Sequence, residues 1–243
     1  MTTGILYGIG VGPGDPELLP LKAVRVLGEV GRVFTAASTR NDYSRAVEIV
    51  RPHIPAATPI ERLDFPMSKD HAVMQNAWQQ HAARIADVLE MGEKAAFLTL
   101  GDPLTYSTYG YVLRHLMAGW PHLSVCTVPG ITAYQAAAAA TNQPLVEGEE
   151  ALLILSGVHG GERLAKMTAV ADNVVFMKAY RNLSSIAGAL EQAGLAAGSV
   201  AVVDCSRAEE KIYTDLHSLA QQAPNYWTLI LAKRNGHASA RKN

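Results

Sequence analysis

The chain alternates short apolar runs with stretches of helical periodicity from one end to the other. In the first half, apolar runs at 5–9, 32–36 and 95–100 predict strands, and helical patterns at 21–30 and 70–91 predict helices. This alternation is typical of mainly parallel sheets covered by helices. The predicted fold class is therefore α/β.

The ends of two predicted helices can be placed from single residues. Asp70 is a suitable N-cap for the helix at 70–91, and Gly92 is a suitable stop for it. Proline is tolerated in the first turn of a helix and breaks its interior, so the earlier helix is expected to begin near Pro20.

Glycine and proline interrupt the chain together at 119–121, after a helix predicted over 106–118. We place the domain boundary there, which gives an N-terminal α/β domain at 1–119 and a C-terminal α/β domain at 120–243. Further strands are predicted after the boundary at 125–128, 151–155, 174–177, 200–204 and 227–232. Both halves contain a strand followed by a Gly- and Pro-containing turn, where open α/β sheets bind ligands, so an active-site cleft is expected between the domains.

Composition narrows the classes of function. Apolar residues make up 49% of the 243 residues and charged residues 18%, which favours a folded protein over a disordered one. The formal charge of -1 disfavours a nucleic-acid partner. No stretch approaches the ~20 apolar residues that span a bilayer and no signal-peptide pattern is present, so we expect no membrane association and a cytosolic location. Cys126 and Cys205 are not paired in spacing, and no two histidines have metal-binding spacing, so no bound metal is expected.

The first candidate turn follows the first predicted strand and has glycines at alternate positions from 8 to 14. Glycine lets the backbone approach a ligand closely. The dinucleotide fingerprint G-x-G-x-x-G fails here, because its third glycine would fall on Pro13 or Asp15. A P-loop fails as well, since no Lys-Ser/Thr pair follows. A tight connection without a ligand is the alternative.

Two further turns carry polar or small residues at comparable places. After the strand at 95–100, the turn has Asp102, Pro103 and then four hydroxyl-bearing side chains within five residues. Such density is typical of a ligand site, although Asp102 and Ser107 also suit helix caps. The third turn, at 128–133, leads into a helix of small residues.

Taken together and in order, the three turns resemble the precorrin and tetrapyrrole methylase superfamily, and the resemblance runs from Tyr7 to Ala232. It implies two α/β domains, S-adenosylmethionine as methyl donor with S-adenosylhomocysteine as product, and a homodimer. Within the superfamily the chain is most similar to the methyltransferases that act on carbon 20 of precorrin-2, or of its cobalt-bearing counterpart. The motifs that carry this similarity are Phe65-Pro66-Met67, the Trp78 helix, Gly101-Asp102-Pro103, Tyr106-Ser107-Thr108-Tyr109, Pro144-Leu145, Gly148-Glu149, Met177-Lys178 and Tyr226-Trp227-Thr228.

The resemblance also implies site residues. Matched positions for contacts with the methyl donor are Pro13, Gly101, Asp102, Thr105, Thr132, Ala133, Met177 and Thr228. Asp102 or Tyr106 is the expected base for the proton that leaves the methylated carbon. Carboxylates of a small-molecule tetrapyrrole substrate are expected to meet cationic side chains, and the candidates are Arg40, Lys178 and Arg181, with Arg45, Lys69 and Arg207 as further possibilities.

Other functions stay open from the sequence alone. Within the superfamily these are a uroporphyrinogen methylase, a diphthine synthase and a ribosomal RNA ribose methylase. Outside it they are a nucleotide-binding oxidoreductase, which the missing fingerprints disfavour, and a non-catalytic binder of tetrapyrrole or S-adenosylmethionine.

Overall fold

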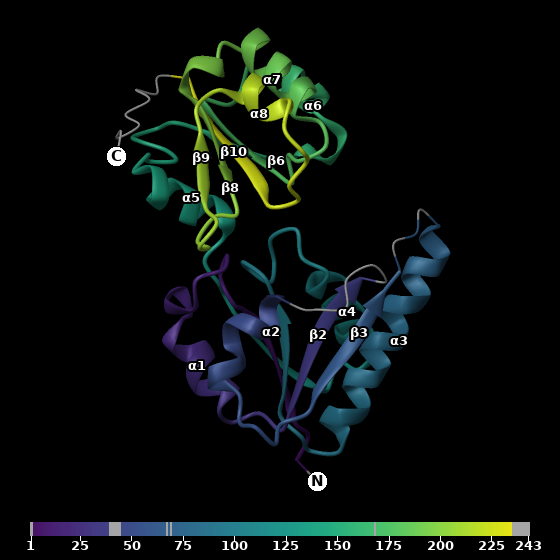
Figure 1. Cartoon of the computed structure of the whole chain (residues 1–243). Helices are drawn as coiled ribbons and strands as arrows, with labels where there is room; N and C mark the ends of the chain where they lie inside the picture. The colour runs from purple at the N-terminus through teal and green to yellow at the C-terminus, as the bar shows by residue number, and fades with distance from the viewer. Residues whose placement is uncertain (1, 39–44, 67, 69, 168, 235–243) are drawn as a thin grey trace. The chain divides into compact units, whose positions relative to one another are not determined.

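The computed structural model divides into two compact units, a first unit at Met1–Thr132 and a second unit at Ala133–Asn243. Each unit has its own five-stranded sheet (Figure 1). The residues that the structure describes are 2–38, 45–66, 68, 70–167 and 169–234.

The sheet of the first unit is entirely parallel and has the strand order β3-β2-β4-β1-β5. Its strands are β1 (Ile5–Gly10), β2 (Arg32–Ser38), β3 (Ile60–Phe65), β4 (Ala95–Thr99) and β5 (Ser124–Val128). Its helices are η1 (Pro16–Leu18), α1 (Leu21–Leu27), α2 (Arg45–Val50), η2 (Arg51–His53), α3 (His71–Glu90) and α4 (Tyr109–Gly119). Since β1 lies between β4 and β5, the carboxyl ends of these three strands are adjacent.

Both faces of this sheet are covered. Side chains alternate between the faces of a strand, so Phe97 of β4 packs into a core with α3 and α4, whereas Leu98 packs into a second core with α1 and α2. All five residues of β4 are buried, which explains its uninterrupted apolar run. Asp70 caps α3 as predicted, because its carboxylate accepts a hydrogen bond from the amide of Ala72 at 2.8 Å.

The second unit contains a mixed sheet of order β6-β7-β10-β8-β9. Its strands are β6 (Leu152–Ser156), β7 (Asn173–Met177), β8 (Ser199–Val203), β9 (Lys211–Tyr213) and β10 (Thr228–Lys233). Its helices are α5 (Ala133–Thr141), η3 (Gly157–His159), α6 (Glu162–Ala165), α7 (Leu183–Gln192), η4 (Ala196–Gly198) and α8 (Leu216–Ala220). Helices α6, α7 and α8 pack on one face of the sheet around a single core (Figure 1).

The predicted α/β class is confirmed, with two corrections. Mainly parallel pairing holds for the first sheet, but in the second only β6 and β7 pair in parallel among the described strands, and β10 runs antiparallel to both β7 and β8. Short apolar runs carry no sign of strand direction, so the sequence could not reveal this. Strand β5 follows the boundary expected after residue 119, yet it pairs with β1 and completes the first sheet. The observed division between the units therefore lies further along the chain.

Strands β3 and β9 were not predicted from the sequence. Both lie at the edge of their sheet, and both carry charged residues where a central strand would be apolar. Among the described residues, no helix combines the length and apolar character needed to cross a membrane.

Candidate active site

Three turns meet at the carboxyl edge of the first sheet, where β1, β4 and β5 end side by side. The turn after β1 and the turn after β4 are joined by a pair of backbone hydrogen bonds between Gly12 and Gly101, with N···O distances of 3.3 and 2.8 Å. Both glycines have positive φ, at 76° and 70°, a conformation that side-chain-bearing residues rarely adopt. Two of the three turns singled out in the sequence are thus bonded directly to each other.

The turns approach so closely that glycine is required at their contact. A Cβ atom added to Gly10 would lie 2.6 Å from the carbonyl oxygen of Gly101 and 2.6 Å from the nitrogen of Gly130. A Cβ atom added to Gly130 would lie 2.2 Å from the same carbonyl oxygen. These are backbone atoms and cannot move aside as a flexible side chain would. The glycines therefore allow the three turns to pack directly against one another.

Asp102 connects two of these turns through its carboxylate. One oxygen accepts hydrogen bonds from the Leu104 amide at 2.9 Å and the Thr105 hydroxyl at 3.2 Å. The other oxygen accepts a hydrogen bond from the Gly130 amide at 3.2 Å. A carboxylate offers about four acceptor positions, so three bonds fix its orientation and one position is left for a ligand. The carboxylate is only partly buried, which keeps it within reach of a ligand.

The residues after Asp102 divide into exposed and structural ones. Tyr106 has a φ of 50° and is 47% exposed, so its phenol lies at the surface of the first unit. Ser107 lies one residue before Thr108, the N-cap of α4, and its hydroxyl accepts a hydrogen bond from the Tyr109 amide at 3.1 Å. Tyr109 itself is fully buried, its ring lies where a Cβ on Gly8 would be, and burial raises the pKa of its hydroxyl. Of the two tyrosines, Tyr106 is the exposed one and Tyr109 is part of the core.

The second unit brings other candidates together at one edge of its own sheet. Because β10 is antiparallel to β7, the beginning of β10 lies beside the end of β7, and the Ala179 amide donates to the Thr228 carbonyl at 3.0 Å. Met177 and Thr228 are therefore neighbours. Lys178 between them has a φ of 58°, and burial lowers the pKa of its ammonium group. Non-glycine residues in this conformation are often found at functional sites.

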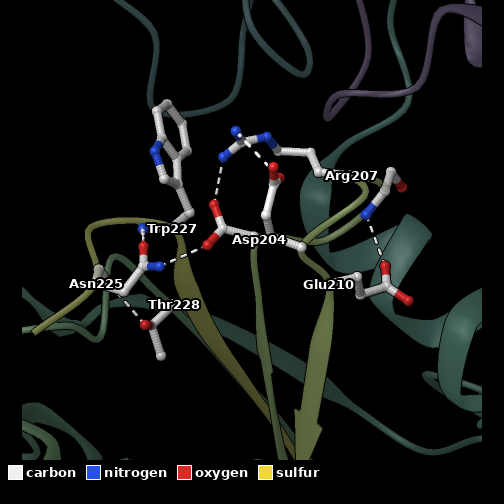
Figure 2. A network of polar contacts seen from close by, with 8 residues as sticks. Asp204, Arg207, Glu210, Asn225, Trp227 and Thr228 are labelled. Carbon is white, nitrogen blue, oxygen red and sulfur yellow. Dashed lines mark hydrogen bonds and ion pairs between the residues drawn. The ribbon is translucent and has the colours of Figure 1, made fainter. Parts of the chain in front are cut away.

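A polar network holds the same edge of the second sheet (Figure 2). Asp204, which follows β8 and is 9% exposed, accepts hydrogen bonds from Arg207 and, at 2.5 Å, from the Asn225 side chain. The Asn225 side chain accepts a bond from the Trp227 amide at 2.9 Å, and its backbone carbonyl accepts one from the Thr228 hydroxyl at 2.7 Å. Asp204 thereby fixes the chain that leads into β10.

The predicted residues are divided between the two units. The first unit holds Pro13, Gly101, Asp102, Thr105, Tyr106 and Thr132. The second unit holds Ala133, Met177, Lys178, Arg181 and Thr228. Arg40 and Lys69 lie outside the described residues. Arg207 bonds Asp204 and also lies 3.5 Å from Glu209, so its charge already has two acidic partners.

Sequence reasoning missed the roles of Asp204 and Asn225. An acid directly after an apolar run was the available signal for Asp204. The role of Asn225 depends on a contact between residues 21 positions apart, which no local pattern reveals. Among the residues that the structure describes, no group of three His, Cys, Asp or Glu side chains is arranged to hold a metal ion.

Known proteins resemble this chain over most of its length. The family model of tetrapyrrole (corrin/porphyrin) methylases matches residues 5–220. The chain is 30% identical over 233 residues to the cobalt-precorrin-2 C(20)-methyltransferase of Salmonella typhimurium, with 95% of this chain and 97% of the relative covered. It is 32% identical over 238 residues to the precorrin-2 C(20)-methyltransferase of a Sinorhizobium species, with 94% of each covered.

A solved structure shares the fold. It is the uroporphyrin-III C-methyltransferase of Thermus thermophilus in complex with S-adenosylhomocysteine, with a TM-score of 0.64, 23% identity, and coverage of 97% of this chain and 98% of that one.

Proposed function

Because this chain belongs to the tetrapyrrole (corrin/porphyrin) methylase family, we propose that it transfers a methyl group from S-adenosylmethionine to carbon 20 of precorrin-2 in cobalamin biosynthesis. Two C(20)-methyltransferases that match it over nearly their full lengths support this acceptor. The structural observation that carries the proposal is the convergence of three glycine-containing turns around Asp102. The chain is thus an enzyme, a C-methyltransferase.

The turns of the first unit fit the methyl donor. S-adenosylmethionine supplies an electrophilic methyl group on a sulfonium and carries an amino group, so it presents positive charge. Asp102 offers an oriented negative charge with an acceptor position left for a ligand, and the glycines bring the turns close enough for its carboxylate to bond Gly130. The residues proposed to hold the donor are Pro13, Gly101, Asp102, Thr105 and Thr132 in the first unit and Ala133, Met177 and Thr228 in the second.

The protein's part in the reaction is chiefly positioning, because the methyl group is already activated. Methyl transfer breaks the bond between the sulfonium sulfur and the methyl group, which leaves S-adenosylhomocysteine, forms one C–C bond and releases one proton from the acceptor carbon. Asp102 and Tyr106 are the proposed acceptors of that proton. The Asp102 carboxylate is fixed by three hydrogen bonds, so of the two it is the better placed to orient S-adenosylmethionine. Tyr106 is exposed, so it is the better placed to face the precorrin-2 acceptor.

The substrate's carboxylates need cationic partners, and Lys178 and Arg181 are proposed for this role. Arg181 is exposed, while the left-handed backbone at Lys178 fixes the point from which its side chain extends. A cobalt-bearing precorrin-2 is the second candidate acceptor, because the Salmonella relative acts on that compound. The metal would then belong to the substrate.

The acceptor is tested by incubating the protein with S-adenosylmethionine and either metal-free precorrin-2 or its cobalt complex. We expect a product heavier than precorrin-2 by one CH₂ group, with the new methyl on carbon 20 by NMR. Transfer to the cobalt complex alone would make cobalt-bearing precorrin-2 the acceptor in place of metal-free precorrin-2. Transfer to neither would contradict the proposed function.

We propose a cytoplasmic homodimer, by analogy with the family. Light scattering on the purified protein should give twice the 26.0 kDa of one chain. A mass of one chain at the concentrations used for assay would contradict the dimer.

A further inference from the structure

Three aromatic rings lie in a row where β7 ends and β10 begins. The ring centres of Tyr180 and Tyr226 are 5.1 Å apart with an angle of 60° between the planes. Those of Tyr226 and Trp227 are 4.9 Å apart with an angle of 86°. Tyr226, in the middle, is 48% exposed, so this aromatic row is part of the surface. None of the three rings belongs to the hydrophobic core of the second unit, which is built from other residues.

Hydrogen bonds fix the backbone on both sides of the aromatic row. The hydrogen bond from the Ala179 amide to the Thr228 carbonyl joins the segment after β7, which carries Tyr180, to the first residue of β10, which follows Tyr226 and Trp227. On the other side, Trp227 is bonded through its amide to Asn225 and through its carbonyl to the Asp204 amide, at 2.9 and 3.1 Å (Figure 2). Side chains fixed before binding lose little conformational entropy when a ligand arrives. Because the backbone of the aromatic row is bonded in this way and its rings pack against one another, the row is preorganised as a binding surface.

Positive charge accompanies the rings. The guanidinium carbon of Arg181 lies 5.1 Å from the centre of the Tyr180 ring, within the range of a cation–π contact. Arg181 is exposed, and within the part of the chain that the structure describes it forms no ion pair with a carboxylate, whereas Arg207 is held by Asp204 and Glu209. A cationic group beside aromatic faces suits a ligand that is both flat and anionic.

We propose that Tyr180, Tyr226 and Trp227, together with Arg181, bind the tetrapyrrole acceptor: the rings contact a face of the macrocycle, and Arg181 binds one of its carboxylates. This inference rests on the proposed function, which supplies a large conjugated ligand with several negative charges. The row lies beside Met177 and Thr228, the residues proposed for the methyl donor in this unit, so an acceptor bound here is held near the donor. The chain as a whole is not basic enough to favour nucleic acid at these rings.

The test compares Tyr226→Leu, which removes the ring, with Tyr226→Phe, which keeps it. Because Tyr226 is half exposed, neither change should disturb the core. For the full-length enzyme we expect Tyr226→Leu to raise KM for precorrin-2 by about 3- to 10-fold, the range of an aromatic contact, and Tyr226→Phe to leave it near the wild-type value. The dissociation constant of S-adenosylhomocysteine, measured by calorimetry, should stay within about twofold in both variants.

A second pair of variants tests the charge. Arg181→Gln should raise KM for precorrin-2 several-fold and weaken its dependence on salt, while Arg181→Lys should recover part of the affinity.

Tyr111→Leu is the matched control for Tyr226→Leu, since it removes a 39% exposed tyrosine from α4 of the first unit and should leave KM unchanged.

Specific results would overturn the inference. Equal weakening of S-adenosylhomocysteine binding by Tyr226→Leu would assign the rings to the donor, and an equal effect of Tyr111→Leu would make the loss nonspecific. An unchanged KM in Tyr226→Leu and Arg181→Gln would leave the row a packing feature. If the wild type transfers no methyl group, the proposed function fails, and quenching of tryptophan fluorescence by precorrin-2 then decides alone: the inference stands if Tyr226→Leu weakens that binding and falls if it does not.

Discussion

The carboxylate of Asp102 accepts a hydrogen bond from the backbone amide of Gly130 at 3.2 Å, although the two residues follow different strands. Asp102 comes after β4 and Gly130 after β5, and β1 lies between these strands in the sheet. The bond therefore reaches across the end of β1, where Gly10 has no side chain to obstruct it. One acid thus ties the turns of the proposed donor site to one another.

Asp102→Asn tests whether that acid binds the donor. Asparagine keeps the shape but loses the charge. Its carbonyl oxygen can accept from one side only, so the NH2 group must face either Gly130 or the Leu104 and Thr105 donors, from which it cannot accept a hydrogen bond. We expect the affinity for S-adenosylmethionine to fall by about 1.5–3 kcal/mol, the range for a hydrogen bond to a charged group, with turnover at saturating donor changed much less. Calorimetry and single-turnover rates on the same variant measure the two effects.

The control for this variant is Asp70→Asn, which changes another capping carboxylate far along the chain and should affect neither quantity, since asparagine is also a good N-cap. Unchanged donor binding in Asp102→Asn with turnover slowed by ~10²–10⁴ would instead identify Asp102 as the base.

The close approach of the turns predicts a strong effect of a single methyl group. Gly10→Ala and Gly130→Ala each place a Cβ within 2.6 Å of backbone atoms, so each should destabilise the protein by about 1–3 kcal/mol or more and weaken donor binding. Gly110→Ala is the matched control, because a Cβ there has nothing within 4 Å and should stabilise α4 by about 0.5–1 kcal/mol. Urea unfolding measures all three, and full stability in Gly10→Ala would contradict the geometry.

Asn173 is predicted to control the acid stability of the second unit. It is 2% exposed, and its side chain donates to the Leu145 carbonyl at 2.9 Å and to Glu150 at 2.8 Å. Asn173→Ala should cost about 1–3 kcal/mol at neutral pH, because it leaves both acceptors without this donor. Urea unfolding monitored by far-UV circular dichroism gives this difference.

The hydrogen bond between Asn173 and Glu150 also makes the stability of the second unit depend on pH. The hydrogen bond from Asn173, followed by one from the Glu147 backbone, lowers the pKa of Glu150. A lowered carboxyl pKa adds stability above the ordinary value of 4.5, and that stability is lost as pH falls through the folded-state pKa. Asn173→Ala should therefore move the acid-side loss to higher pH, and Glu150→Gln should remove this part of the pH dependence. If stability falls at low pH in both variants as it does in the wild type, the contact between Asn173 and Glu150 is contradicted.

His217 and Glu191 form an exposed pair that links α8 to α7, with 2.7 Å between the ring nitrogen and the carboxylate. The hydrogen bond and the charge of Glu191 raise the pKa of His217 above its ordinary value of 6.5. The stability from this pair is present below that value and lost as pH rises through the folded-state pKa. Glu191→Gln should return the His217 pKa toward 6.5 in an NMR titration. A titration midpoint equal to that of the wild type would contradict the pair.

Part of the site could be predicted from the sequence because its signals are local. Glycine at alternate positions, an acid before proline, and small residues before a helix each reflect what the backbone must do at that point of the chain. The ends of α3 were predictable for the same reason, since Asp70 bonds an amide two residues away. The charged edge strands β3 and β9 gave no such signal.

The sequence by itself determined the α/β class, the three turns and the family, because these depend on periodicity and on residues close together in the chain. Only the tertiary structure decided that β5 completes the first sheet, that β10 runs against its neighbours, and that Asp204, Asn225 and Trp227 form one network. Strand partners and their directions are chosen by contacts between distant residues. No local pattern records those contacts, so they emerge only when the chain has folded.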